Sequence, residues 1–225
     1  MAQAALTIDA GGVLLVPDPA ALREALADFA VEPTDEDCRR AHYEVMHLID
    51  ETPDPDYVAV SALLAAALGV PSDRVRRAGP VLAAAYVGSR WVPAPGAAEA
   101  LARLESAGYP LAVVSNSSHG QIERLLTEFG LCGTSGPGAR MAVVLDSHVV
   151  GIEKPDVRIF ELAARALGTP PSRCTHVGDS VSVDVVGAEA AGMAAIHIDP
   201  YGFCHSDQHA HAASLGAVAD DLVSQ

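Results

Sequence analysis

A short apolar run near the N-terminus ends in a carboxylate and is followed closely by two glycines. The run extends from Ala4 to Ile8, the carboxylate is Asp9, and the glycines are Gly11 and Gly12. In an open α/β sheet, ligands bind in the crevice outside the carboxyl ends of the strands. Glycines let a ligand approach the backbone closely. The alternative is a strand followed by a tight turn that Asp9 caps, and this stretch alone favours neither interpretation.

The second half of the chain alternates between predicted strands and predicted helices. The predicted strands are residues 110–114, 141–145, 174–177 and 194–198, and the predicted helices are residues 96–107, 119–129, 156–167 and 181–191. Residues 132–140 are predicted to form a loop because they contain three glycines and a proline. Alternating strands and helices indicate right-handed crossovers and a parallel sheet. We therefore expect an α/β fold with a Rossmann-like parallel sheet flanked by helices.

Residues 18–90 show helical spacing and no convincing strand. Helices are predicted over residues 19–30, 34–50, 54–68 and 72–88. Thr34 precedes three acidic residues, which is typical of a helix N-terminus, and Asp54, Pro55 and Asp56 open the third helix. We expect residues 1–17 and 91–225 to form the Rossmann-like core, with residues 18–90 inserted as a helical cap over the carboxyl edge of the sheet.

Net charge and composition argue against some classes of binding partner for this chain. The formal net charge is −15 at pH 7, which argues against binding to nucleic acid or to an anionic membrane surface. An anionic substrate would have to be attracted locally, by a metal or a few basic residues. No apolar stretch is long enough to predict a membrane span, and the N-terminus lacks the pattern of a signal peptide. Four separated cysteines suit reduced thiols in a cytoplasmic protein.

A single lysine stands out among the 14 lysine and arginine residues of the chain. It is Lys154, and the other residues in this count are all arginines. Abundant alanine, arginine and glycine indicate a composition bias that replaces lysine with arginine wherever either would serve. The retained lysine is therefore a candidate for chemistry that needs a compact charge on a flexible stem.

Polar side chains follow several of the predicted strands and should meet at one edge of the sheet. They are Asp9, Ser115 with Asn116, Lys154 in a loop, and Asp179 with Asp184. Each has an ordinary alternative, as a helix cap or a surface charge. Three carboxylates at one edge repel one another unless a cation lies among them, and hard oxygen ligands suit Mg²⁺. A lysine and a hydroxyl near a metal would hold phosphate oxygens.

The ordered motifs resemble those of the haloacid dehalogenase-like hydrolase superfamily. The resemblance rests on Asp9-x-x-Gly-Val, Ser115-Asn116, Lys154-Pro155-Asp156 and Gly178-Asp179-Ser180-x-x-x-Asp184, and it covers nearly the whole chain. The helical insertion is similar to the C1-type cap of that family, and Pro93-x-Pro95-Gly96 resembles its return into the core.

The resemblance implies a role for each of these residues. Asp9 would be the nucleophile and would form an aspartyl-phosphate. Ser115 and Asn116 would bind the transferring phosphoryl group, with Gly11 and Gly12 beside it. Lys154 would neutralise Asp9 and the phosphate of a small phosphorylated metabolite.

The resemblance also implies a set of metal ligands. Asp179 and Asp184 would hold Mg²⁺ together with Asp9 and the backbone carbonyl of Gly11.

One position departs from the pattern of the phosphatases in this superfamily. They place a second aspartate two residues after the nucleophile, where this chain has Gly11. That aspartate protonates the leaving oxygen, and a positioned general acid–base contributes on the order of 10²–10⁴ in rate. His42, Tyr43 or His47 of the cap could supply the acid, although a structural or exposed role is the simpler interpretation of each.

Three functions stay open at this stage. The first is a Mg²⁺-dependent phosphatase or phosphotransferase whose leaving group needs little help from an acid, or whose acid comes from the cap or the substrate. The second is a dehalogenase-like C–X hydrolase, although such enzymes do not need Mg²⁺ and Gly178-Asp179 is typical of a metal site. The third is a binding or regulatory protein that retains the pocket but turns over poorly. Phosphonate hydrolases use a cap lysine, which residues 18–90 lack.

A segment near the C-terminus is rich in histidine. It extends from Cys204 to His211 and offers ligands for a transition metal, but within eight residues it lacks the spacing of a closed zinc site. We predict a solvated loop here. Because the segment follows the strand that ends at Ile198, part of it is expected near the active-site edge.

Overall fold

The computed structural model describes residues 4–52, 57–86 and 90–224. The chain divides into two compact units, a core unit of Met1–Leu15 and Pro93–Gln225 and a helical unit of Val16–Val92. The chain passes between the units through two short strands that pair with each other, β2 (Leu15–Pro17) and β3 (Trp91–Pro93).

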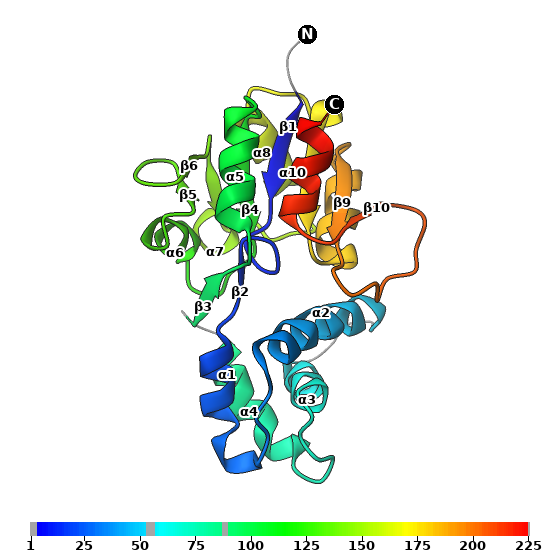
Figure 1. The fold of residues 1–225 in the computed structure, drawn as a ribbon. Helices are drawn as coiled ribbons and strands as arrows, with labels where there is room; N and C mark the ends of the chain where they lie inside the picture. The colour runs from blue at the N-terminus through cyan, green and yellow to red at the C-terminus, as the bar shows by residue number, and fades with distance from the viewer. Residues whose placement is uncertain (1–3, 53–56, 87–89, 225) are drawn as a thin grey trace. The chain divides into compact units, whose positions relative to one another are not determined.

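The core unit is built on a sheet of six parallel strands in the order β10-β9-β8-β1-β4-β7 (Figure 1). The strands are β1 (Ala5–Ile8), β4 (Leu111–Ser115), β7 (Val144–Asp146), β8 (Cys174–Gly178), β9 (Ala194–Ile198) and β10 (Ala210–Ala212). Every residue of β1 is buried because β1 lies inside the sheet and helices cover both faces. The predicted α/β class with a Rossmann-like parallel sheet is confirmed.

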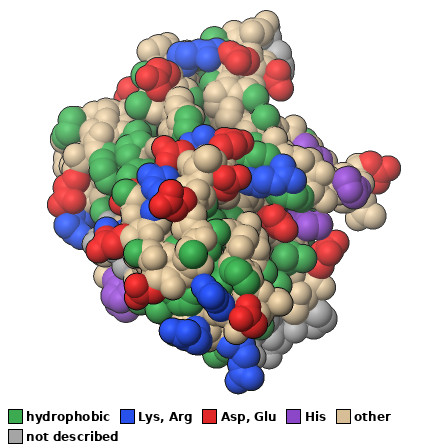
Figure 2. Space-filling model, turned by 60° about the horizontal axis from the view of Figure 1, so that its bottom comes forward, with side chains coloured by type: hydrophobic (Ala, Val, Ile, Leu, Met, Phe, Trp, Pro, Cys, Tyr) green, Lys and Arg blue, Asp and Glu red, His purple; other side chains and the backbone are tan. Residues whose placement is uncertain are grey.

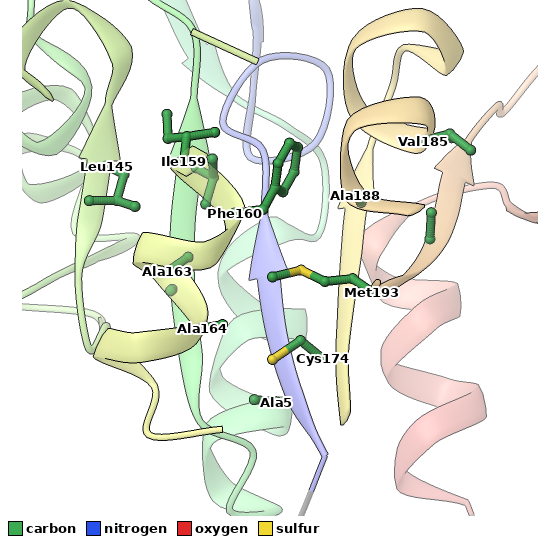
Figure 3. Close-up of a cluster of buried hydrophobic side chains, with 13 residues drawn as sticks. Ala5, Leu145, Ile159, Phe160, Ala163, Ala164, Cys174, Val185, Ala188 and Met193 are labelled. Atoms are coloured by element: carbon green, nitrogen blue, oxygen red, sulfur yellow. The ribbon is translucent and has the colours of Figure 1, made fainter. Parts of the chain in front are cut away.

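Helices cover the sheet on both sides. On one face lie α5 (Ala97–Ser106) and α10 (Leu215–Val223), and on the other lie α8 (Val157–Ala166) and α9 (Val186–Ala190) (Figures 1 and 3). Helix α8 presents Ile159, Phe160 and Ala163 to the sheet at helical spacing. Phe160 is fully buried in this cluster, and truncating such a side chain to alanine costs about 3–5 kcal/mol.

Some predicted boundaries were wrong. The segment predicted as a loop over 132–140 contains β5 (Cys132–Gly133) and β6 (Ala139–Arg140), which pair with each other. The strand expected over 141–145 begins only at Val144, and the helix expected to begin at residue 119 is α6 (Ile122–Glu128). Local composition favours loops at glycines, whereas pairing partners distant in sequence decide which of these residues become strands.

Two further segments differ from expectation. The helix predicted over 181–191 begins with a wide helical turn, η3 (Val181–Val185), before α9, and the chain forms a short helical turn η2 (Pro171–Arg173) before β8. The segment 204–211, predicted as a solvated loop, ends in β10, which pairs with β9 in register His211 to His197. Backbone pairing with the sheet overrides the polar composition of this segment.

The helical unit has its own apolar core. Its helices are α1 (Pro19–Ala25), η1 (Ala27–Phe29), α2 (Asp35–Glu51), α3 (Tyr57–Ala67) and α4 (Val75–Tyr86). Thr34 caps α2 by accepting a hydrogen bond from the Asp37 backbone amide, while the Asp37 carboxylate accepts one from the Thr34 amide. Leu22, Leu64 and Leu82 pack together in the apolar core.

Parts of the predicted helical pattern fall beyond the described ranges. The expected opening of the third helix at Asp54, Pro55 and Asp56, and the expected end of the fourth at Gly88, lie outside the described residues. Whether the helical unit acts as a cap stays a prediction. Within residues 4–52, 57–86 and 90–224, no helix combines the length and the apolar character needed to cross a membrane.

Candidate active site

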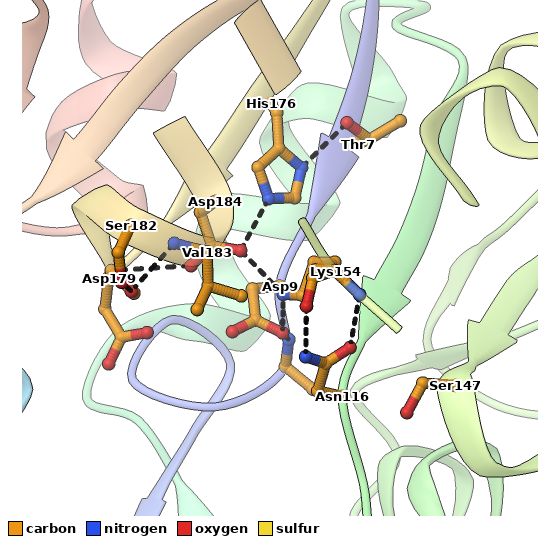
Figure 4. Close-up of polar contacts among 12 residues, drawn as sticks. Thr7, Asp9, Asn116, Ser147, Lys154, His176, Asp179, Ser182, Val183 and Asp184 are labelled. Atoms are coloured by element: carbon orange, nitrogen blue, oxygen red, sulfur yellow. Dashed lines mark hydrogen bonds and ion pairs between the residues drawn. The ribbon is translucent and has the colours of Figure 1, made fainter. Parts of the chain in front are cut away.

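Polar residues meet at the carboxyl edge of three neighbouring strands, β8, β1 and β4 (Figure 4). Asp9 follows β1 directly, Ser115 is the last residue of β4, and Asp179 follows β8 directly. The strands run in register, with Ile8 opposite Val113 on one side and Val177 on the other. Parallel pairing therefore brings together residues that are more than 100 positions apart in the sequence.

Lys154 lies between two of the carboxylates. Its Nζ is 2.9 Å from Oδ1 of Asp9 and 2.6 Å from Oδ1 of Asp184, and its side chain is 1% exposed. Burial favours the neutral amine, but the negative charges of Asp184 and Asp9 outweigh it and raise the pKa of Lys154. The lysine is therefore a fixed positive charge at this edge.

Asp184 has two further partners. Its Oδ1 is 3.0 Å from Nε2 of His176, and its Oδ2 accepts a hydrogen bond of 3.1 Å from the Ser180 backbone amide. Burial disfavours the charged form, but Lys154 and then His176 outweigh that effect and lower the pKa of Asp184. The carboxylate stays ionised and is held in one orientation by contacts on both oxygens.

His176 was missed by the sequence analysis. It is fully buried in β8, and its Nδ1 is 2.9 Å from Oγ1 of Thr7, the residue opposite it on β1. Burial lowers the pKa of His176. A signal was available, because Thr7 is the one polar residue of β1 and His176 is a polar residue of the neighbouring strand β8, which indicates a buried hydrogen-bonded pair.

Asp9 is more difficult to ionise than an exposed aspartate. Burial raises its pKa to about 7, although the Lys154 charge acts in the opposite direction, and the charges of Asp184 and Asp179 add to the rise. The Oδ1 atom of Asp9 also accepts a hydrogen bond of 2.7 Å from the Ala10 amide. The carboxylate is oriented by two donors and lies among like charges.

The three carboxylates form a set of ligands suited to a hard divalent cation. One oxygen from each of Asp9, Asp179 and Asp184 lies within 4.8 Å of the others, and all three residues are buried. With Lys154, the ionised set carries a net charge of −2, which a divalent cation would balance. Buried carboxylate oxygens fit Mg²⁺. The predicted carbonyl ligand of Gly11 stays a prediction.

Two glycines allow the chain to pass very close to these carboxylates. A Cβ on Gly12, which has φ of +65°, would lie 2.0 Å from Oδ2 of Asp179, and a Cβ on Gly178 would lie 2.2 Å from Cγ of Asp184. Any side chain at these positions would collide with a carboxylate. Gly11 does not share the left-handed conformation of Gly12, so its backbone does not demand glycine.

Asn116 holds the loop that carries the lysine. Its Nδ2 donates to the carbonyl of Lys154 at 3.0 Å, and its Oδ1 accepts from the amide of Lys154 at 2.9 Å. Asn116 is therefore a positioning residue for Lys154, and the expected contact with phosphate stays a prediction. Ser115 is buried beside it at the end of β4.

The turn after Ser115 is organised by Asp146, which the sequence analysis also missed. Its carboxylate accepts hydrogen bonds from Oγ of Ser117 at 2.6 Å and from the Ile122 amide at 3.1 Å. Asp146 ends β7 opposite Ser115. No local pattern indicated this contact, because its partners are 24 and 29 residues away in sequence.

The three residues considered as alternative acids lie in the helical unit. His42 is buried and packs edge-on against Tyr43 and Trp91, with ring centroids 5.0 and 5.9 Å apart. Nε2 of His47 is 3.6 Å from Oε1 of Glu51, one helical turn away. These contacts give His42 a packing role inside its own unit.

Comparison with known families gives one match that covers most of the chain. Residues 4–192 match the family described as haloacid dehalogenase-like hydrolase. The matched range includes Asp9 after β1, the loop that carries Lys154, and Asp179 and Asp184 after β8.

Individual relatives include both phosphatases and dehalogenases. The chain is 34% identical to the glyceraldehyde 3-phosphate phosphatase of Methanothermobacter thermautotrophicus over 134 residues, which are 59% of this chain and 56% of that protein. It is 30% identical to the (S)-2-haloacid dehalogenase H-109 of Pseudomonas putida over 135 residues, 58% of this chain and 57% of that protein. The chain thus spans about half the length of these curated relatives.

Solved structures share the fold. The HAD-hydrolase YfnB from Bacillus subtilis, whose structure contains bound magnesium, has a TM-score of 0.62 at 18% identity and covers 99% of both chains. At this identity the similarity concerns the fold alone.

Proposed function

Because the chain belongs to the haloacid dehalogenase-like hydrolases, we propose that it is a Mg²⁺-dependent phosphatase or phosphotransferase acting on a small phosphorylated metabolite. The observation that carries the proposal is the placement of Asp9, buried at the end of β1, 2.9 Å from the ammonium of Lys154 and within a set of three carboxylates. Phosphatases among the relatives support the same class of substrate.

Asp9 is the proposed nucleophile. The Ala10 amide and Lys154 both contact Oδ1, which orients the carboxylate. Its attack on phosphorus forms an aspartyl-phosphate as the bond to the leaving oxygen breaks, and water then releases phosphate and restores the carboxylate. Lys154 balances charge on Asp9 and on the transferring group.

Residues at the carboxyl edge of the sheet are proposed to hold an anionic substrate although the chain as a whole is acidic. Figure 2 shows acidic and basic side chains interspersed over the face drawn, so attraction on that face has to be local. Ser115 and the loop held by Asn116 are proposed to bind phosphoryl oxygens. Asp9, Asp179 and Asp184 would hold Mg²⁺, which when bound neutralises charge that develops on the phosphoryl group.

Gly11 supports a second candidate function. Without a carboxylic acid at this position, no side chain of residue 11 protonates the leaving oxygen, and the pocket could serve a binding or regulatory protein that turns over poorly. A dehalogenase-like C–X hydrolase is the third candidate, since one relative carries that name. The three clustered carboxylates favour the metal-dependent phosphatase over the dehalogenase, and the presence of the nucleophile Asp9 beside Lys154 favours it over the binding protein.

The test is phosphate release with Mg²⁺ from acyl, aryl, sugar and alkyl phosphates. Wild type should act on substrates with good leaving groups, and Asp9→Asn should abolish the reaction, because an amide is a poor nucleophile. Glu99→Gln, which removes an exposed carboxylate from α5, should leave it unchanged.

The same assay separates the three candidates. Binding of Mg²⁺ and phosphate without turnover on any substrate would favour the binding protein. Halide release from 2-haloacids without added Mg²⁺ would favour the dehalogenase.

A further inference from the structure

Four side chains with soft or borderline ligand atoms converge beside β9 and β10, in a group distinct from the three carboxylates. They are His197 on β9, Cys204 and His209 in the connecting loop, and His211 on β10, and we name them the His/Cys cluster. One ligand atom from each lies within 4.8 Å of all the others. Residues 197 and 211 are opposite each other in the parallel pairing, so both side chains project from the same face.

His197 has a buried nitrogen without a partner. The residue is 4% exposed, and its Nδ1 has no hydrogen-bond partner in the structure. Its Nε2 lies 3.2 Å from the carbonyl oxygen of Asp179, which can only accept, so Nε2 carries the proton. In the neutral ring Nδ1 then holds a lone pair. A metal-ligating histidine commonly donates its other N–H to a carbonyl in this way.

The remaining ligands are held near His197 by their own contacts. Ring centroids of His209 and His211 lie 5.4 and 5.3 Å from that of His197. Nε2 of His211 is 2.9 Å from the carbonyl oxygen of Ser206, which repeats the arrangement found at His197. His197 on β9 and His211 on β10 thus each have one ring nitrogen in contact with a carbonyl group.

The position of Cys204 is set by an aspartate at the end of β9. The backbone amide of Cys204 donates to Oδ2 of Asp199 at 2.8 Å, and that of Phe203 donates to Oδ1 at 3.1 Å. Sγ of Cys204, a free thiol, is then 3.7 Å from Nε2 of His209. Sulfur and nitrogen ligands of a tetrahedral zinc ion are separated by about 3.5 Å, given bonds of about 2.3 and 2.0–2.1 Å.

We propose that the His/Cys cluster is a binding site for a zinc-class transition metal. One thiolate and three imidazoles suit a tetrahedral Zn²⁺ rather than Mg²⁺. Binding replaces the thiol proton of Cys204 with the metal and releases that proton. The bound metal ties the loop between β9 and β10 (Figure 1) to the sheet and, through His197, to the main chain of Asp179.

The His/Cys cluster is partly open to solvent, as a site that takes up a metal ion must be. His197 is buried, Cys204 and His209 are half-buried, and His211 is exposed, so a metal can enter from solvent.

The test uses the full chain, stripped with a chelator and titrated with Co²⁺ in excess Mg²⁺. One equivalent should produce the absorption of four-coordinate cobalt and a thiolate-to-cobalt charge-transfer band, and Zn²⁺ should displace it. Cys204→Ser should remove the charge-transfer band. His211→Ala, at an exposed ligand, should weaken Co²⁺ binding at least about tenfold, because loss of a residue that only hydrogen-bonds to a metal ligand already lowers metal affinity about 10–100-fold.

Matched variants separate this site from others. His205→Ala changes an exposed histidine of the same loop, and Cys38→Ser changes a buried thiol of the helical unit; both should retain full binding. A wild type without the charge-transfer band, a Cys204→Ser that keeps it, or equal loss in His205→Ala and His211→Ala would overturn the proposal. Circular dichroism of each variant confirms that it is folded.

Discussion

The carboxylate set at the ends of β1 and β8 and the His/Cys cluster at β9 and β10 belong to one sheet but differ in every property that selects an ion. The first has three buried carboxylates, two of which are paired with one lysine. The second has imidazoles and a thiol that range from buried to exposed. The difference shows how one parallel sheet can present hard ligands after one strand and soft or borderline ligands at the next, because each strand and the loop after it bring their own side chains.

The largest expected effect comes from the lysine, which the second site lacks. Lys154→Met should lower the free energy of unfolding by about 3–5 kcal/mol, because it leaves buried carboxylates without their partner. Phosphate release should be lost as well. Urea unfolding and the phosphate assay measure these effects. Arg173→Met, at an exposed arginine, should stay within about 0.5 kcal/mol of wild type. Equal losses in both variants would contradict the ion-pair interpretation.

The next effect concerns the missing acid of the carboxylate site. Gly11→Asp places a carboxyl group near the proposed leaving oxygen, and the backbone of Gly11 is not in the left-handed region. Turnover of alkyl phosphates should rise by on the order of 10² relative to wild type, in line with general acid catalysis. Steady-state rates over a series of leaving groups measure it. Gly11→Asn has the same shape without the acid, and an equal gain there would contradict the explanation.

A smaller effect tests whether the two sites bind their ions independently. Asp179→Asn should weaken Mg²⁺ binding at least about tenfold and leave Co²⁺ binding at the His/Cys cluster unchanged, because the hydrogen bond from His197 is accepted by the main-chain carbonyl of Asp179, which the substitution retains. Cys204→Ser should show the opposite pattern. Calorimetric titration with each ion measures both. Loss of both ions in either variant would show one shared site.

The smallest effect concerns a buried thiol outside both sites. Burial raises the pKa of Cys132 from 9.0 to about 12, so the unfolded chain ionises first and the free energy of unfolding should decline as the pH rises from about 9 toward 12. Urea unfolding at several pH values measures the decline. Cys132→Ala should show a shallower decline. A decline that is unchanged in Cys132→Ala would assign it to other groups.

Local sequence determined much of the framework. The apolar run before Asp9 forms β1, and the strand expected at 194–198 has those bounds in the structure. Thr34 caps its helix as the acidic first turn predicted. These features depend on neighbours within a few residues, so periodicity and capping patterns are sufficient to find them.

Only the tertiary structure decided which polar groups meet. The contact between Lys154 and Asp184, the support of Asp184 by His176, and the hydrogen bonds of Asp146 join residues from different elements. The pairing of β10 with β9 likewise turned a predicted solvated loop into part of a candidate metal site. A sequence pattern states which residue types are present and at what spacing. Distances between strand ends depend on strand order and register, which are set by packing across the whole sheet.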